Sequence, residues 1–379
     1  MSSLILLLLA APLLADGLDP DRLARLDAVV EAAIQRGDCP GAVLVVVHRD
    51  AVAYRKAFGT RDGKQPMTVD TVFDLASLTK PVATAACVMV LLERGDLRPS
   101  DKVVKHWPEF AANGKGDVTL EHCLTHTSGL IADNAMADYA DGGEAALKKV
   151  AALKLEVPPG TRFRYSDVGY IVLGEVVARV SKKPLAEFAK ENLFAPLKMT
   201  DTGYLPSAEW KKRAAPTGKR KNETILGEVH DPRAFALGGV AGHAGLFSTA
   251  DDLARFAHML LRGGELEGKR VLGALTVRKY TEPRAVPGGF RSRGWDVDTA
   301  YTGQRGELFP AGDGYGHTGF TGTSIWIDPP SRTAVILLTN RTFNGDRASV
   351  TELRRRVATT VASAVTDAGV RMQMGGSGK

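Results

Sequence analysis

The segment Asp74-Leu75-Ala76-Ser77-Leu78-Thr79-Lys80 decides how the rest of this sequence is interpreted. Ser77 and Lys80 are three residues apart, so a helix that begins at Ser77 places both side chains on one face of its first turn. A serine hydroxyl becomes a nucleophile when a neighbouring base takes its proton, and an amine with a lowered pKa can be that base. On their own, these residues are weak evidence for catalysis, and a helix N-cap serine followed by a solvated lysine is the favoured interpretation.

The residues that follow favour a buried helix with an irregular start. Pro81 biases Lys80 away from helical geometry, so we expect a locally irregular turn there. The run 82–94 is apolar nearly all round, which is typical of a helix inside the core, and Gly95 is a natural stop.

The two ends of the chain predict one antiparallel sheet. Residues 42–48 and 51–58 read as a hairpin, and 324–328 with 333–339 read as a second hairpin around Pro329-Pro330-Ser331. A helix precedes the first hairpin and another follows the second. Their apolar stripes are Leu23, Leu26, Val30 and Ile34, after Asp19-Pro20, and Val350, Leu353, Val357, Val361 and Val365.

The expected fold class is therefore α+β, an antiparallel sheet flanked by the N- and C-terminal helices with a mostly helical region inserted. We expect one domain over 16–370, its sheet part formed by 16–80 and 310–370 and its helical insert by 81–309. Two segments, roughly 205–240 and 281–316, are rich in Gly, Pro and Arg. Loops of that length are usually substrate-facing or mobile.

Composition describes an ordinary globular protein. Hydrophobic residues make up 44% of the 379 residues and charged residues 24%, and the net charge of +6 is mild. The basic residues between 211 and 221 have no interleaved aromatics, so we expect a solvated loop and no nucleic-acid partner. Cys39, Cys87 and Cys123 form no Cys-x-x-Cys pair, and we expect buried thiols rather than disulfides.

Residues 1–15, MSSLILLLLAAPLLA, have the apolar run and small residues of a secretory signal peptide, although no Lys or Arg precedes the run. We expect a periplasmic or secreted protein with no stable membrane span after leader removal. An N-terminal membrane anchor is the alternative. Residues 371–379 are expected to form a disordered tail.

Further motifs lie far from Ser77 in the sequence. Tyr165-Ser166-Asp167 precedes a helical pattern, so Ser166 or Asp167 also fits a helix cap, and residues 316–322 also fit a glycine-rich strand entry. Together with Ser77-x-x-Lys80 they occur in an order that one superfamily shares. The chain resembles the serine β-lactamase and penicillin-binding protein superfamily, in its class C-like branch of class C β-lactamases, D-alanyl peptidases and family VIII carboxylesterases. The resemblance covers about 40–365 and is carried by Ser77-Leu78-Thr79-Lys80, Tyr165-Ser166-Asp167, His317-Thr318-Gly319, Leu124-Thr125-His126-Thr127-Ser128-Gly129-Leu130, Ala244-Gly245-Leu246-Phe247-Ser248-Thr249 and Pro40-Gly41.

This resemblance implies a serine hydrolase that works through an acyl-serine intermediate. Ser77 would attack an ester or amide carbonyl, with Lys80 and Tyr165 sharing its proton and returning one to the leaving group. The backbone N–H groups of Ser77 and Phe320 would hold the oxyanion. By the same resemblance, the residues around the substrate would be Asp167, His317, Thr318 and Gly319. No metal or organic cofactor is implied, and the expected substrates are small esters, β-lactams or peptidoglycan-type peptides.

Two residues depart from the class C β-lactamase pattern, which has Asn where this chain has Asp167 and Lys where it has His317. A carboxylate near Lys80 should favour the ammonium form and oppose its role as base. An imidazole is a less dependable cation for a substrate carboxylate. Both changes argue against efficient β-lactam hydrolysis. Our hypothesis is that Asp167 faces His317 and raises the pKa of its imidazole.

Three other readings of the sequence compete. His122 and His126 at i and i+4, with His230 or His243, are compatible with a zinc hydrolase, but Cys123 stands where the metalloprotease pattern needs Glu. A conventional α/β-hydrolase needs a Gly-x-Ser-x-Gly elbow, and the chain has none. A catalytically silent peptidoglycan- or peptide-binding protein on the same scaffold remains the alternative function, because Asp167 and His317 are altered. Among active enzymes, the sequence leaves open an esterase, a D-amino-acid peptidase or a weak β-lactamase, and of these we favour a general serine hydrolase with esterase activity.

Overall fold

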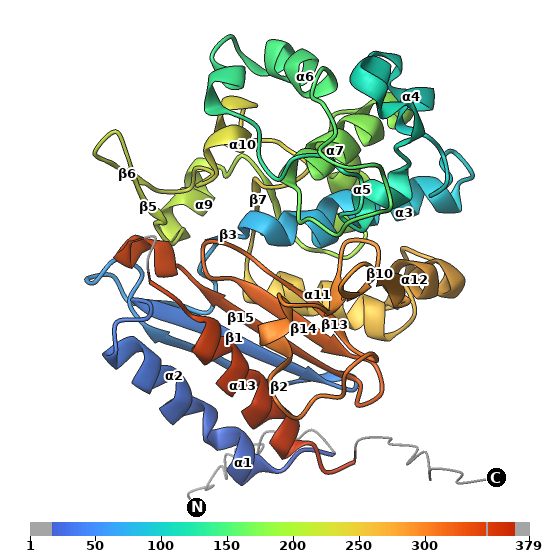
Figure 1. The fold of residues 1–379 in the computed structure, drawn as a ribbon. Helices are drawn as coiled ribbons and strands as arrows, with labels where there is room; N and C mark the ends of the chain where they lie inside the picture. The colour runs from blue at the N-terminus through green and yellow to red at the C-terminus, as the bar shows by residue number, and fades with distance from the viewer. Residues whose placement is uncertain (1–16, 346–347, 368–379) are drawn as a thin grey trace, which may run out of the picture.

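The computed structural model describes residues 17–345 and 348–367. The expected signal peptide (1–15) and tail (371–379) lie outside them. An antiparallel eight-stranded sheet, in the order β10-β11-β12-β13-β14-β15-β1-β2, forms the lower layer in Figure 1. Its strands are β1 (Gly41–His48), β2 (Ala51–Gly59), β10 (Arg284–Val286), β11 (Gly289–Arg291), β12 (Asp296–Asp298), β13 (Tyr315–Thr318), β14 (Ser324–Asp328) and β15 (Thr333–Thr339).

The two ends of the chain meet in this sheet where β1 lies beside β15, as expected from the two hairpins. Strand β1 pairs with β15, so that Val43 lies opposite Leu338 and Val45 opposite Ile336. Every residue of β1 is buried because both faces of the sheet are covered. Val43, Val45 and Val47 face one core cluster and Ala42, Leu44 and Val46 face the other.

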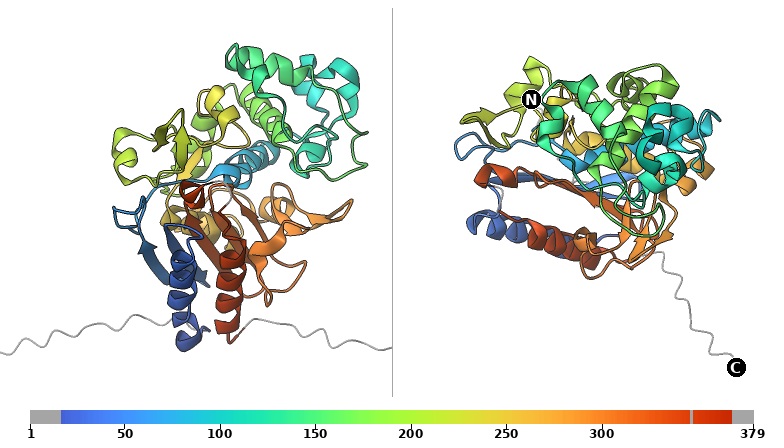
Figure 2. Two further views of the ribbon diagram at one scale, coloured as in Figure 1. Left: turned by 60° about the vertical axis from the view of Figure 1, so that its left-hand side comes forward. Right: turned by 45° about the horizontal axis from the view of Figure 1, so that its top comes forward.

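Helices cover each face of the sheet. On one face, α1 (Pro20–Ala24), α2 (Leu26–Gln35) and α13 (Thr351–Ala364) lie side by side, as Figure 2 shows in blue and red. The side chain of Asp19 caps α1, as the sequence indicated, but the expected single helix is divided at Arg25. On the other face, α11 (Ala250–Leu261) packs on β1 and β15.

The helical region stands above the sheet in Figure 1. It begins with a 3₁₀ turn η1 (Ala76–Leu78), a π-helical turn η2 (Lys80–Ala85) and α3 (Ala86–Glu93). The stretch Ala76–Glu93 is long and apolar enough to cross a membrane, yet 83% of it is buried inside the protein, which agrees with the expected core helix. The remaining helices are α4 (Val103–His106), η3 (Pro108–Asp117), α5 (Leu120–Leu124), η4 (Met136–Tyr139), α6 (Gly143–Ala151), α7 (Asp167–Ser181), α8 (Leu185–Ala189), η5 (Lys190–Phe194), α9 (Ala208–Arg213) and α10 (Pro232–Ala236).

A small sheet in the order β3-β7-β4 lies next to the Ser77 segment. It joins β3 (Phe73–Asp74), β7 (Leu246–Ser248) and β4 (Gly203–Tyr204), and the backbone N–H of Leu75 donates to Leu246 O at 2.9 Å. This sheet fixes the chain immediately before Ser77. The remaining short elements are β5 (Gly218–Arg220), β6 (Glu223–Ile225), β8 (Glu265–Leu266), β9 (Lys269–Arg270), α12 (Ala274–Thr281), η6 (Thr302–Arg305) and η7 (Arg341–Asn344).

The structure also differs from the expected extent of the helical insert. The expected helical insert, 81–309, includes α11 and β10–β12, which belong to the sheet layer. Three-residue strands containing Gly and Arg have too little alternation to be recognised from the sequence. All three cysteines are buried free thiols, as expected.

Candidate active site

Ser77 lies in a strained turn between the small sheet and the buried helix. Ala76, the preceding residue, has φ +45°, which is unfavourable for a residue with a Cβ. A buried carboxylate holds this turn: Asp74 Oδ1 accepts the N–H of Ala76 at 2.8 Å, and Oδ2 accepts the N–H of His230 at 2.6 Å. The expected irregular turn at Pro81 is present as a π-helical turn, in agreement with the missing N–H of proline.

Lys80 is fully buried, and its ammonium contacts three oxygens. Nζ donates to Ser77 Oγ at 2.8 Å and to His243 O at 3.1 Å, and lies 2.6 Å from Asp167 Oδ1. Burial acts to lower the pKa of Lys80, but Asp167 and Tyr165 outweigh burial, so the pKa lies above its ordinary value. The expected effect of a carboxylate at position 167 is therefore present in the structure.

Tyr165 completes the group around the Ser77 hydroxyl. Its ring stacks on His126 with centroids 4.4 Å apart, and Lys80 Nζ lies 4.9 Å from the Tyr165 ring centroid. The Tyr165 hydroxyl is close enough to Lys80 and Ser77 for both side chains to act to lower its pKa. Burial raises the pKa of Tyr165 although Lys80 acts to lower it, so the hydroxyl keeps its proton and can donate it. The three residues predicted to carry the chemistry are thus in mutual contact.

The loop that carries Phe320 is fastened to the segment before Ser77. Thr321 Oγ1 donates to Asp74 O at 2.7 Å, and Thr323 Oγ1 donates to Leu75 O at 2.9 Å. Within the described residues, no backbone carbonyl accepts the N–H of Ser77 or of Phe320. Both N–H groups are therefore available to a developing oxyanion, as the sequence-based assignment requires.

Gly319 is required at the point where this loop crosses the chain. A Cβ at Gly319 would lie 2.1 Å from Thr323 Oγ1 and 2.3 Å from Leu75 O. Since the second of these atoms belongs to the backbone, a side chain cannot be accommodated by a rotamer change. Gly319 lines the cavity, as its assignment to substrate binding requires, and it also allows the loop that carries Phe320 to approach the backbone of Leu75, two residues before Ser77.

His317 and Asp167 do not form the predicted pair. His317 Nδ1 lies 2.8 Å from Thr318 O, whereas Asp167 pairs with Lys80. Burial, together with the positive charges of Arg291 and Lys80, lowers the pKa of His317 well below its ordinary value. The hypothesis that Asp167 raises the His317 pKa is therefore wrong, because the ammonium takes the carboxylate and the imidazole is buried beside cations. His317 is a neutral residue of the cavity wall.

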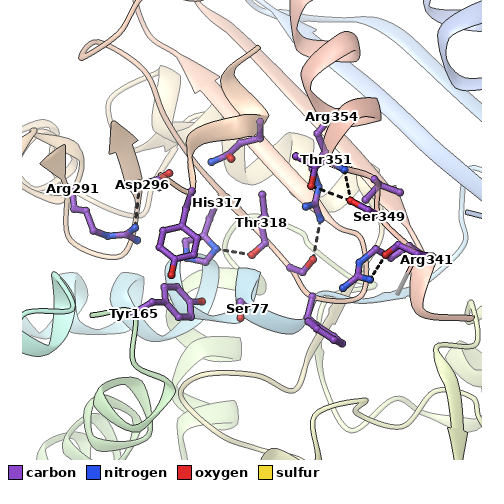
Figure 3. Close-up of a pocket in the computed structure, with 16 residues that line it drawn as sticks. Ser77, Tyr165, Arg291, Asp296, His317, Thr318, Arg341, Ser349, Thr351 and Arg354 are labelled. Atoms are coloured by element: carbon purple, nitrogen blue, oxygen red, sulfur yellow. Dashed lines mark hydrogen bonds and ion pairs between the residues drawn. The ribbon is translucent and has the colours of Figure 1, made fainter. Parts of the chain in front are cut away.

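A cavity of about 440 Å³ opens beside Ser77 and is rich in arginine (Figure 3). Ser77, Tyr165, His317, Thr318 and Gly319 line it together with Arg291, Arg341, Arg354 and Asp296. The sequence did not single out these arginines individually. The only available signal was the Arg-rich segment 281–316, which was expected to face substrate or to be mobile; its Arg291 lies in β11.

A second cavity of about 420 Å³ shares Ser77, Tyr165 and Phe320 with the first. Carboxylates dominate its other lining: Asp133, Asp167 and Asp231, with Arg233 and His243. Only Asp167 among these acids was identified from the sequence. The nucleophile thus stands between a basic cavity and an acidic one.

The histidines proposed for a zinc site have other partners. His122 Nδ1 accepts the N–H of Thr119 at 3.2 Å, and His126 Nδ1 accepts the N–H of Ser166 at 3.0 Å. Among the described residues, Asp167, Asp231 and His243 bring ligand atoms within 4.8 Å of one another. Because Asp167 binds the Lys80 ammonium and Asp231 binds His243 Nε2 at 2.9 Å, these groups have protein partners that a cation would have to displace.

Comparison with known proteins finds relatives that match most of the chain. A protein of Escherichia coli K12, named as a candidate D-alanyl-D-alanine carboxypeptidase, is 32% identical over 86% of this chain and 83% of its own length. An N-acetylmuramyl-L-alanine amidase of Bacillus subtilis 168 is 31% identical over 84% of this chain and 81% of its own length. A penicillin-binding protein homologue from Caulobacter crescentus shares the fold, with a TM-score of 0.73 and 23% identity over 92% of this chain and 99% of that one.

The profile of the Beta-lactamase family matches residues 26–359, which include every residue placed around Ser77. The match therefore covers the sheet, the helical region and the loop that carries Phe320. With Ser77, Lys80 and Tyr165 in contact, the chain is a serine hydrolase and belongs to the Beta-lactamase family, in the superfamily of serine β-lactamases and penicillin-binding proteins.

Proposed function

We propose that this enzyme is a carboxypeptidase-type hydrolase that cleaves an amide whose leaving group carries a free carboxylate, with D-alanyl-D-alanine peptide ends as the substrate class. One observation carries the proposal: Arg291 and Arg354 line the cavity that contains Ser77, and each has buried N–H donors without an acceptor in the described part of the chain. Buried guanidinium groups with free donors are suited to a carboxylate.

The arginines are incompletely neutralised. Arg291 is fully buried and pairs with Asp296 through one nitrogen, at 3.2 Å, while its Nε and Nη2 have no hydrogen-bond partner among the described residues. Arg354 donates to Gly319 O and Thr323 O at 2.9 and 2.8 Å, and no described acidic residue pairs with it. Burial and the charge of Arg341 lower the pKa of Arg354 to about 9, so a bound anion would stabilise its charged form.

The remaining steps use the residues around Ser77. Once Lys80 has lost its proton, it accepts the proton of Ser77 Oγ as that oxygen attacks the peptide carbonyl carbon. The N–H groups of Ser77 and Phe320 bind the carbonyl oxygen as it becomes negative. Tyr165 donates its proton to the departing amine and is reprotonated through Lys80. Water then attacks the acyl-serine ester, which releases the new carboxylic acid and restores Ser77.

The names of the two relatives support an amide substrate, because a D-alanyl-D-alanine carboxypeptidase and an N-acetylmuramyl-L-alanine amidase both act on amide bonds. The active-site geometry alone is compatible with esters as well, since a more reactive carbonyl needs the same nucleophile and oxyanion donors. The arginine-rich cavity adds a requirement on the substrate: its leaving group should carry a free carboxylate.

A matched pair of substrates tests the proposal. We expect Nα-acetyl-L-norleucyl-D-alanyl-D-alanine to be cleaved with a kcat/KM about tenfold or more above that of its C-terminal carboxamide, because charge-assisted hydrogen bonds contribute about 1.5–3 kcal/mol. Ser77→Ala should abolish both activities. The preference should collapse in Arg291→Met and persist in Arg278→Met, which removes an exposed arginine of α12.

Three outcomes would overturn the proposal. Equal rates for the acid and the carboxamide would show that the arginines do not select a carboxylate. Serine-dependent release of 4-nitrophenol from a simple ester, without cleavage of either peptide, would assign an esterase instead. No serine-dependent turnover of any of these substrates would favour the silent binding protein.

A further inference from the structure

The arginine-rich cavity has two cationic ends, although a single carboxylate would occupy only one of them. Arg291 lies in β11 and Arg354 in α13, and Figure 3 shows them on opposite sides of His317 and Thr318. Besides burial, the charges of Arg291, Lys80 and Arg354 lower the pKa of His317, which agrees with a position of the imidazole between the two arginines. The two guanidinium groups are therefore separate sites for negative charge within one cavity.

The end at Arg291 is a buried polar site with unused hydrogen-bonding groups. Asp296 pairs with one nitrogen of Arg291 at 3.2 Å, and its carboxylate also accepts hydrogen bonds from two threonine hydroxyls. Gln304 is 3% exposed and lines the same cavity, and neither end of its amide has a hydrogen-bond partner among the described residues. Because buried polar groups are nearly always hydrogen-bonded, these groups indicate that a polar ligand occupies this end.

The end at Arg354 lies at the start of a long helix. Thr351 is the first residue of α13, which has 14 residues, and it lines the cavity together with Arg354. Nη2 of Arg354 donates to two backbone carbonyls of the loop that carries Phe320, whereas its Nε has no hydrogen-bond partner in the described part of the chain. The partial positive charge of a helix N-terminus adds to that of the guanidinium, so an anion is favoured at this end too.

The cavity is also larger than a single D-alanine requires. Its volume of about 440 Å³ equals that of roughly fifteen molecules of liquid water. A leaving D-alanine has one carboxylate and would leave most of this space, and one of the two arginines, unused. A leaving group whose side chain ends in a second carboxylate fills more of the cavity and provides an anion for each arginine.

We propose that the end of the cavity at Arg354 is a subsite for a second carboxylate, so that the enzyme prefers a leaving group with an acidic side chain, such as D-glutamate, over D-alanine. This inference rests on the proposed function, which places the leaving group in the arginine-rich cavity. The terminal carboxylate binds at Arg291, and the side-chain carboxylate binds between Arg354 and the start of α13.

Two peptides that differ by one charge test this subsite. Nα-acetyl-L-norleucyl-D-alanyl-D-glutamate and its D-glutamine analogue have the same shape and the same terminal carboxylate. We expect the D-glutamate peptide to have a kcat/KM about fivefold or more higher, because a hydrogen bond to a charged group is stronger than one between neutral groups. The ratio of the two values should fall towards one in Arg354→Met. It should fall below one in Thr351→Asp, which places a carboxylate at the start of α13.

Thr351→Asp is the deciding variant. Arg354→Met also removes the hydrogen bonds to the loop that carries Phe320 and can slow the cleavage of both peptides, whereas Thr351 is exposed and an acidic residue is stabilising at a helix start. Thr224→Asp is the matched control, because it makes the same change at an exposed threonine of β6, and it should leave the ratio as in the wild type. A wild-type ratio in Thr351→Asp would overturn the inference.

The outcomes separate this inference from the proposed function. If the D-glutamate and D-glutamine peptides are cleaved at equal rates, or if only the D-alanyl-D-alanine peptide is cleaved, the second subsite is refuted and the carboxypeptidase activity stands. If none of the three peptides is cleaved, the proposed function fails, and calorimetric titration of Ser77→Ala with N-acetyl-D-glutamate and N-acetyl-D-glutamine decides the subsite. Binding of the D-glutamate compound about fivefold or more tighter, lost when Thr351→Asp is added, would sustain the subsite, and equal affinities would refute it.

Discussion

The ammonium nitrogen of Lys80 lies 2.6 Å from Oδ1 of Asp167, and Lys80 also donates a hydrogen bond to the nucleophile Ser77. The proposed base is therefore held in its charged form by a neighbouring carboxylate. Since burial alone would lower the pKa of Lys80, Asp167 reverses the direction that burial sets. Position 167 consequently controls how much of the enzyme has an unprotonated base at neutral pH.

Asp167→Asn should raise activity at neutral pH. The substitution removes the charge that raises the Lys80 pKa and leaves burial, which lowers it, so the amine loses its proton at a lower pH. The rise of kcat/KM with pH should move to lower pH, and each unit of this shift increases the neutral-pH rate about tenfold. A pH-rate profile on an uncharged 4-nitrophenyl ester measures it. An unchanged profile would exclude Lys80 as the base that limits the reaction.

His317 should remain neutral at pH values where an ordinary histidine is charged. Burial, Arg291 and Lys80 all disfavour the imidazolium, and the Asp167 carboxylate that was expected to favour it is paired with Lys80. NMR titration of the histidine ring signals from pH 8 to pH 5.5, with His317→Gln to assign the resonance, should show no protonation of His317. Titration of His317 near pH 6.5 would contradict this account.

The sequence predicted the central contacts of the site because Ser77, Lys80 and Tyr165 occur in short motifs whose order is informative. It predicted the paired hairpins because β1, β14 and β15 are continuous apolar runs. It could not identify Arg291, which reaches the cavity only because β11 pairs with β12 in a segment without periodicity. Arg354 was overlooked for a different reason. The apolar stripe of α13 predicts only which face of the helix is buried, and Arg354 lies next to that face rather than in the stripe.

The pairing of Asp167 was misjudged because Lys80 and His317 were both candidate partners for one carboxylate. A sequence gives no distance between Asp167 and either residue, and in the structure Asp167 pairs with Lys80. The strands β10–β12 were missed because three residues are too few for an alternating pattern. In each case the missing information was a spatial arrangement of distant residues.

Gly319→Ala should reduce kcat about 100- to 1000-fold, the usual effect of losing one oxyanion donor. A methyl group at this position would meet Leu75 O and Thr323 Oγ1 at 2.3 and 2.1 Å, so the loop must move and carry the N–H of Phe320 away from Ser77. Gly116→Ala is the matched control, because nothing lies within 4 Å of its added Cβ. Full activity of Gly319→Ala on a 4-nitrophenyl ester, with the thermal midpoint unchanged, would mean that Phe320 is not an oxyanion donor.

Asp74→Asn should reduce kcat and should also change how stability depends on pH. The carboxylate accepts the N–H groups of Ala76 and His230, and an amide cannot accept both through its two side-chain ends. Burial raises the pKa of Asp74 to about 6 from an ordinary value of 3.8. Because the folded protein holds this proton more tightly than the unfolded chain, the stabilisation is complete below about pH 4 and is lost as pH rises through about 6.

Asp252 provides the matched control for Asp74. Burial also raises its pKa to about 6, but its carboxylate binds Thr202 and the N–H of Asp201, away from Ser77. Relative to each Asn variant, the free energy of unfolding of the wild type should therefore fall by roughly 3 kcal/mol between pH 4 and pH 7. Urea unfolding at both pH values measures this change. Only Asp74→Asn should lower kcat, and equal losses of kcat in both variants would show that Asp74 acts through general stability rather than by positioning Ser77.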